Sequence, residues 1–233
     1  MITLYQFATS PFTEKVRRAL NFKGIAFDVH EVARAKVGEG AYQDVSPTGK
    51  FPVIVDDGQA VWDSTDIIFH LERQHPGPNL VPSDPWEAAV AHAIEEWADE
   101  SLYFYEMTMR LSWEHNLEAA LDEFAESMPG VPKPQLKTMI LNGVAQLTQA
   151  QGVGRKPRDQ VVGDVERHLG ALNALLKGRD WVVGDALSYA DLAVIGQLNA
   201  LLYAEEASAA LSALQDSDEI TPWMQRLDRI APK

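Results

Sequence analysis

The sequence predicts a chain of two parts, an α/β unit with the element order β-α-β-α-β-β-α and an all-helical unit after it. Short β-like and amphipathic helical segments alternate along the first third of the chain. Four prolines then fall between residues 76 and 85, where they stiffen a connection and interrupt regular structure. Only helical patterns follow. We therefore expect an α/β domain over residues 1–76, a linker over 77–86 and a helical domain over 87–233.

The first strand and helix are defined by their residue types. Residues 2–7, ITLYQF, are β-branched and aromatic, which is typical of a buried strand. Residues 11–24 carry apolar side chains at helical spacing, begin with a proline and end at Gly24. Residues 25–32 alternate apolar with polar and predict a second strand, and the polar stretch 33–45 has weak helical character.

A hairpin and a helix complete the α/β unit. The segments 51–55 and 59–62 predict two strands, joined by a turn at Asp57-Gly58. Residues 63–75 form an amphipathic pattern with Ile67, Ile68 and Leu71 on its inner face. Beyond the prolines, the helical patterns cover residues 86–115, 136–152, 157–178, 188–206 and 221–231, with a break over 129–134.

Composition excludes several classes of function. The chain has 233 residues, 20 basic against 34 acidic side chains and a net charge of −14, which disfavours nucleic acid and anionic membranes as partners. It has no cysteine, which excludes a catalytic thiol, a thiolate zinc site and a CxxC redox pair. No secretory or membrane-spanning pattern is evident, so we expect a cytoplasmic protein. The histidines form no i, i+4 pair, so we expect no metal site.

Ser10 lies where the first strand gives way to a helix. A serine at this position is an ordinary N-cap, and that interpretation needs no further chemistry. The same geometry also presents free backbone N–H groups and a positive dipole end, which favour an anion. The Ser10 hydroxyl could then stabilise a thiolate that the substrate itself brings.

Phe51-Pro52 begins the third strand. A cis bond there would direct the Phe51 N–H and C=O outward to pair with a peptide, whereas a trans proline entering an edge strand is the more ordinary arrangement. Lys50 is either a solvated lysine or a partner for a carboxylate. Asp63 and Ser64 either cap the helix that follows or hold the charged end of a zwitterionic peptide.

The joint occurrence of these segments resembles the cytosolic glutathione transferase family. The matching segments are S-P-F-T-E-K-V-R-R-A-L, S-P-T-G-K-F-P, D-D-G and D-S-T-D-I-I, with D-W-V-V-G-D-A-L-S-Y-A-D-L-A in the helical unit. Ser10-Pro11-Phe12 is most similar to plant-type tau members, whereas omega-type members carry cysteine in place of the serine. The absence of an S-S-C-x-W segment argues against a zeta-type isomerase. Ser188 and Asp191 form a capping box to which we assign no chemistry.

The resemblance implies a thioredoxin-like first domain, a helical-bundle second domain and a homodimer. It implies that Ser10 stabilises the thiolate of glutathione, which is a substrate, and that no metal is needed. Glutathione would be held by Phe12, Lys50, Phe51, Pro52, Asp63 and Ser64.

Two residues depart from the family pattern. Asp63 replaces the more usual glutamate and is one methylene shorter, and Asp66 replaces the usual alanine. If Asp66 points inward, it would repel the γ-glutamyl carboxylate of glutathione.

The second substrate, a small hydrophobic electrophile, is expected between the domains. Helical spacing places Tyr103, Met107 and Arg110 on one face, where they either line that cleft or pack between helices. Arg110 could attract an anionic second substrate. The sequence thus predicts a glutathione S-transferase. A non-catalytic binding or scaffold protein of the same fold, and a glutathione-dependent peroxidase or dehalogenase, are the alternatives.

Overall fold

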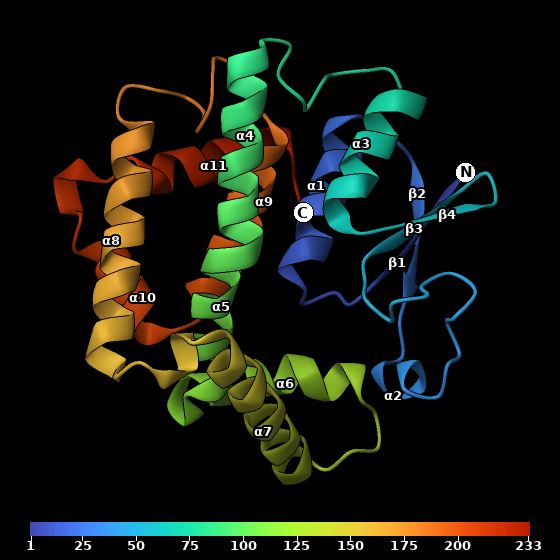
Figure 1. Cartoon of the computed structure of the whole chain (residues 1–233), viewed down its shortest axis with the longest axis vertical. Coiled ribbons are helices and arrows are strands. Elements are labelled where there is room, and N and C mark those ends of the chain that lie inside the picture. Colours follow the sequence, from blue (N-terminus) through green and yellow to red (C-terminus); the bar gives the residue numbers. More distant parts are fainter.

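A four-stranded sheet forms the centre of the first unit in the computed structural model, which describes residues 1–233 (Figure 1). The spatial order is β2-β1-β3-β4, with β1 parallel to β2 and the other pairs antiparallel. The predicted order β-α-β-α-β-β-α is confirmed. The elements are β1 (Ile2–Gln6), α1 (Pro11–Phe22), β2 (Phe27–Glu31), α2 (Arg34–Val37), β3 (Val53–Asp56), β4 (Gln59–Trp62) and α3 (Ser64–Gln74).

Helix α1 is the element that joins the two units. Pro11 begins it, and Val16, Ala19 and Leu20 are fully buried along its length. It packs against α3 and, more extensively, against α9 of the helical unit (Figure 1). The C-terminal end of the chain returns to α1, where Arg18 donates a hydrogen bond to the carbonyl of Ala231 (2.6 Å). Helix α1 is therefore held by elements of both units.

The helical unit begins with one long helix that contains two π-helical turns. It consists of α4 (Pro85–Trp97), the π-helical turn η1 (Ala98–Leu102), α5 (Tyr103–Glu106) and the π-helical turn η2 (Met107–Ser112). The prediction of an unbroken helix over residues 86–115 was wrong at Trp113, which is extended with φ −94° and ψ 118°. Its indole is buried in the main hydrophobic cluster, so tertiary packing ends the helix where the local sequence has no helix breaker.

Helices α6 to α11 complete the bundle. The predicted helix over residues 188–206 was also wrong, because α9 ends at Leu201 and the extended, fully buried Ala204 precedes a separate α10. The remaining elements are α6 (Glu114–Ser127), α7 (Lys133–Gln151), the 3₁₀ turn η3 (Val153–Arg155), α8 (Arg158–Leu176), α9 (Tyr189–Leu201), α10 (Glu205–Ser212), the 3₁₀ turn η4 (Gln215–Ser217) and α11 (Ile220–Ile230).

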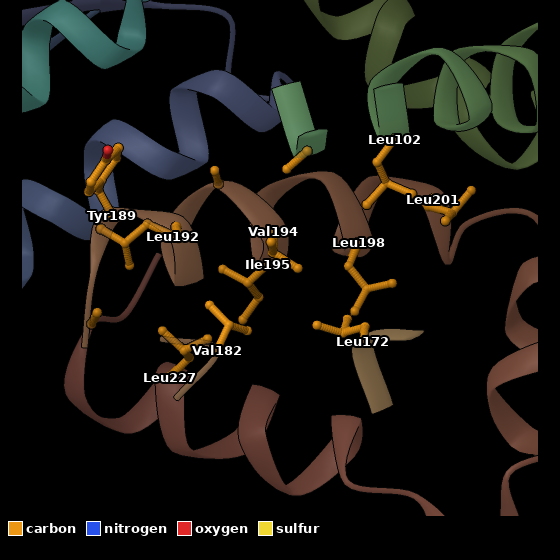
Figure 2. Packing of buried hydrophobic residues seen from close by; sticks show 14 of the residues in the cluster. Leu102, Leu172, Val182, Tyr189, Leu192, Val194, Ile195, Leu198, Leu201 and Leu227 are labelled. Atoms are coloured by element: carbon orange, nitrogen blue, oxygen red, sulfur yellow. The ribbon is translucent and has the colours of Figure 1, made fainter. Parts of the chain in front are cut away.

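One hydrophobic cluster extends through both units, from Ile2 in β1 to Ala231 near the end of the chain. Helix α9 lies at its centre and is buried on all sides, as expected of a helix that is apolar around its whole circumference. Figure 2 shows this packing, with Leu192, Ile195 and Leu198 of α9 surrounded by side chains of neighbouring elements. None of the helices combines the length and the apolar character that crossing a bilayer requires.

Candidate active site

A cavity of about 890 Å³ lies between the sheet unit and the helical unit, and residues of both units line it. All ten side chains that the sequence pointed to lie on its walls. They are Ser10, Phe12, Lys50, Phe51, Pro52, Asp63, Ser64, Tyr103, Met107 and Arg110. Segments that are far apart in the sequence thus meet at one place in the fold.

Ser10 is the N-cap of α1, but its hydroxyl takes no part in capping. The residue is extended, with φ −81° and ψ 129°, its N–H donates to the carbonyl of Phe7 (3.0 Å), and its carbonyl accepts from the N–H of Glu14 (3.0 Å). No hydrogen bond joins the side chain to the first turn of the helix. The capping interpretation therefore accounts for the backbone of Ser10 and leaves its hydroxyl free at the positive end of the helix dipole.

Gly196 of α9 fixes the position of Ser10 through its neighbour Pro11. A Cβ atom at Gly196 would lie 2.6 Å from the carbonyl oxygen and 3.4 Å from the carbonyl carbon of Pro11. Both atoms are backbone, so only a shift of α1 or α9 could relieve such a contact. This glycine was not predicted from the sequence, because a glycine inside an apolar helix carries no signal of what lies against it.

We expect a Gly196→Ala variant to lose about 1–3 kcal/mol of stability, because the added methyl group overpacks the crossing of α1 and α9. Urea unfolding measures the loss. Gly170→Ala on α8 is the matched control, since nothing lies within 4 Å of a Cβ there and alanine favours a helix. Equal behaviour of the two variants would contradict the role of the close approach.

The turn before β3 presents Lys50 and Phe51 to the cavity. The Phe51–Pro52 peptide bond is cis. Neither the N–H nor the C=O of Phe51 belongs to the backbone hydrogen bonds of the turns and loops, whereas the carbonyl of Lys50 accepts from the Ser46 hydroxyl (2.7 Å). The Phe51 ring packs edge-on against Phe7, with 5.3 Å between centroids, and the Lys50 side chain is exposed at the cavity.

Asp63, Ser64 and Asp66 surround the start of α3. Asp63 caps the helix, with one carboxylate oxygen accepting from the N–H of Thr65 (2.9 Å). Its φ of 72° is unusual for a residue other than glycine, and such conformations concentrate at ligand sites. Ser64 is buried, whereas Asp66 is exposed and lines the cavity.

A buried polar network lies directly behind α3 and was not predicted from the sequence. Lys15 of α1 is fully buried and donates to Ser64 Oγ (3.1 Å), Thr65 Oγ1 (3.0 Å) and Asp99 Oδ2 (2.8 Å), and it also contacts Glu95. Burial lowers the pKa of Lys15, but Asp99 and Glu95 outweigh it, so that the pKa lies above its usual value. Burial raises the pKa of Asp99 to about 6, although Lys15 opposes this. The network connects the two units beneath the predicted glutathione site.

The predicted electrophile side is partly aromatic. Tyr103 packs edge-on against Phe12 across the two units, with 5.0 Å between centroids, and burial raises the pKa of its phenol to about 12. The expectation that the charge of Arg110 is available to an anionic substrate was wrong. Arg110 is buried and donates to Glu106 (2.9 Å), with Glu123 at 3.5 Å, so its charge is already balanced.

Two histidines contact the same carboxylate outside the cavity. The spacing of the histidines in the sequence, which includes no i, i+4 pair, did not reveal this contact. His70 Nε2 and His75 Nε2 both donate to one carboxylate oxygen of Asp56, at 2.9 and 2.7 Å. The two residues are five apart on and after α3, and Asp56 ends β3. Hydrogen bonds from His75 and His70 hold the pKa of Asp56 below its usual value, despite the opposing effect of burial. The contact joins the end of β3 to the C-terminal end of α3.

A thioredoxin-like sheet unit, a helical bundle and a cavity lined by both are the architecture of a two-domain protein of the glutathione transferase fold. Family models agree with this. The N-terminal domain of glutathione S-transferases matches residues 4–79, and the C-terminal domain of the same family matches residues 140–230. The chain belongs to the glutathione S-transferase family, whose substrate is glutathione.

Curated proteins with several different names are similar to this chain in sequence. A probable maleylacetoacetate isomerase 1 of Drosophila melanogaster is 35% identical over 98 residues, which cover 40% of each chain. Protein LigF of a Sphingobium species is 27% identical over 86% of this chain and 79% of its own. FtsZ-localized protein A of Caulobacter vibrioides is 26% identical over 86% of this chain and 77% of its own. The match to the isomerase therefore covers less than half of either chain. The missing S-S-C-x-W segment argued against this class of enzyme.

Solved structures show the same fold over nearly the whole chain. A glutathione S-transferase from Rhodospirillum rubrum has a TM-score of 0.67 at 21% identity and covers 98% of this chain and 88% of its own. One from Methylobacillus flagellatus, solved with glutathione bound, has a TM-score of 0.64 at 22% identity and covers both chains in full. At this level of identity the likeness establishes the fold.

Proposed function

We propose that the chain is a glutathione S-transferase in which the Ser10 hydroxyl donates a hydrogen bond to the glutathione thiolate. The observation that carries this proposal is the unused hydroxyl at the start of α1, on the wall of the cavity. A donor at a helix N-terminus favours an anion, so it lowers the pKa of a bound thiol. The thiolate then attacks an electrophile that the apolar part of the cavity holds beside it.

The proposed binding mode uses groups that line the cavity. Lys50 meets the glycine carboxylate, and the backbone of Phe51 pairs with the cysteinyl residue next to cis Pro52. Phe12 packs beside the cysteinyl group, while Asp63 and Ser64 hold the γ-glutamyl end. In the reaction, the thiol proton leaves to solvent and a bond forms between sulfur and the electrophilic carbon. In a substitution, the leaving group departs with the electrons of the bond that breaks.

We expect Ser10→Ala to raise the pKa of the bound glutathione thiol and to slow conjugation about ten- to a hundred-fold. A hydrogen bond to a charged group contributes about 1.5–3 kcal/mol, which converts to a rate loss of that size. The absorbance of the thiolate in the ultraviolet, titrated against pH, measures the pKa, and initial rates measure conjugation. Glutathione affinity is expected to change much less than the rate.

Ser208→Ala, an exposed serine on α10, is the matched control and should behave as the unaltered protein. Equal losses of rate and of glutathione affinity in Ser10→Ala would remove the assigned role of the hydroxyl. Binding of glutathione with no lowering of its thiol pKa in the unaltered protein would favour the competing function, a non-catalytic binding protein. The similarity to FtsZ-localized protein A is the observation that favours this second candidate function.

Peroxide reduction and dehalogenation use the same thiolate on another acceptor. An activity screen on the unaltered protein, with Ser10→Ala as the blank, separates these reactions from conjugation. The proposal also includes a homodimer, the assembly that the family resemblance implies.

A further inference from the structure

Arg34, at the start of α2, carries a positive charge with no carboxylate partner. Its one side-chain hydrogen bond is a long one to Thr9 Oγ1 (3.4 Å), and its Nε is buried without any partner. The guanidinium lies 3.8 Å from the centroid of the Phe7 ring and 5.3 Å from that of Phe124. A charge held against aromatic rings without a counter-ion is unfavourable unless something else balances it.

The neighbouring arginine differs in this respect. Arg110 is paired with Glu106 and Glu123, whereas no acidic side chain forms an ion pair with Arg34. Glu31, the nearest acid along the chain, is bonded to Gln6. Burial and the nearby Arg110 lower the pKa of Arg34 to about 10, although Tyr103 and the charge of Glu31 oppose this, so the guanidinium stays charged at neutral pH.

The position of Arg34 connects this charge to the proposed chemistry. A second cavity of about 680 Å³ adjoins the first, and both are lined by Phe7, Thr9, Ser10, Pro11, Arg34 and Arg110. The Arg34 guanidinium therefore lies where the two cavities adjoin, and Ser10 lines the same two cavities. Figure 1 shows α2 facing α6, which agrees with the contact between Arg34 and Phe124.

We propose that Arg34 binds a carboxylate of the second substrate, so that the preferred electrophiles are aromatic or apolar molecules bearing an acidic group. The planar fork of a guanidinium matches a carboxylate, and the Phe7 and Phe124 rings hold it in place. The inference rests on the proposed function and names the class of its second substrate. The glycine end of glutathione is the other possible source of a carboxylate, and the test distinguishes the two.

The test compares two electrophiles of nearly the same shape. Chlorodinitrobenzene is neutral, and chloronitrobenzoate carries a carboxylate in place of the nitro group para to chlorine. In both, the sulfur bonds to the ring carbon and chloride leaves with the bonding electrons. Arg34→Met should lower kcat/KM for the benzoate about ten- to a hundred-fold and change that for the neutral compound by less than about three-fold. Arg34→Lys should retain part of the preference.

Arg73→Met is the control, because it removes one positive charge from an exposed position on α3 outside both cavities. Because Arg34→Met removes an unpaired charge, its melting temperature should be equal to or higher than that of the unaltered protein. Loss of a structural ion pair would lower the melting temperature instead. Equal losses with both electrophiles overturn the inference. Equal losses with a weaker affinity for glutathione assign the carboxylate to glutathione instead.

Failure of the proposed function is separable from failure of this inference. If the protein turns over neither compound, binding of the unreactive methylnitrobenzoate and its dinitro analogue is measured by calorimetry. Tighter binding of the benzoate that Arg34→Met abolishes supports the carboxylate site without any catalysis. Equal binding of the two analogues to the unaltered protein overturns it.

Discussion

An Asp191→Ala variant is expected to lose at least about 4 kcal/mol of stability, a large share of the roughly 5–15 kcal/mol that holds a folded domain together. The carboxylate of Asp191 is fully buried and accepts hydrogen bonds from two backbone groups, the N–H of Val182 and the N–H of Ser188, each at 3.0 Å. It also accepts from the Ser188 hydroxyl and from Trp223 Nε1, again at 3.0 Å.

The size of the effect follows from the donors that remain. Alanine would leave four buried donors without a partner, at about 1–3 kcal/mol each before any relaxation. The donors belong to the loop before α9, to its N-cap and to α11, so three segments would loosen together. Urea unfolding followed by tryptophan fluorescence measures the loss.

Two further variants make the result for Asp191 specific. Asp191→Asn keeps the shape and one acceptor oxygen, so its loss should be intermediate. Asp185→Ala removes an exposed carboxylate from the same loop and should change the stability by less than about 0.5 kcal/mol. A loss below about 1 kcal/mol in Asp191→Ala would contradict the importance assigned to these bonds.

A Lys15→Met variant is expected to be destabilised by about 3–5 kcal/mol, because it leaves two buried carboxylates without their cation. Glu95 and Asp99 are both buried and both contact Lys15. The variant is also expected to bind glutathione less well, since Lys15 holds the side chains of Ser64 and Thr65 at the start of α3. Equilibrium unfolding and glutathione titration measure the two effects.

A triple variant tests the origin of that loss. Lys15→Met combined with Glu95→Gln and Asp99→Asn carries no buried charge in the network and should recover most of the stability. If the triple variant is no more stable than Lys15→Met, packing of the lysine stem rather than unpaired charge is responsible.

The same network predicts a pH dependence. Because the folded-state pKa of Asp99 is raised from 3.8 to about 6, its contribution to stability is complete below pH 3.8 and is lost as the pH rises through about 6. Asp99→Asn should remove this slope. An unchanged slope in the variant would assign the titration to another group.

The sequence predicted most of the fold because its elements have local signals. Pro11 begins α1, Asp57-Gly58 forms the hairpin turn, and the capping box at Ser188 begins α9. The helix end at Trp113 was not predictable, because burial of the indole decides it and no breaker residue stands there.

The residues of the site could be predicted from the sequence only where they lie in recognisable motifs next to turns. Ser10 and Lys50 could be identified in that way, and the structure places both on one cavity. Lys15 and Arg34 could not, since a lysine or arginine in a polar stretch predicts a solvated side chain. Only the tertiary structure shows that Lys15 is enclosed by carboxylates and that Arg34 forms no ion pair with a carboxylate.

The contact between Gly196 and the carbonyl of Pro11 restricts how this chain could exchange parts with its relatives. A chimera that joins this thioredoxin-like half to a foreign helical half would keep the position of Pro11 and Ser10 only if the incoming helix also lacked a side chain at the crossing. Recombination at the proline-rich connection would cut through no helix or strand, yet it would separate Pro11 from the glycine that its close approach to α9 requires.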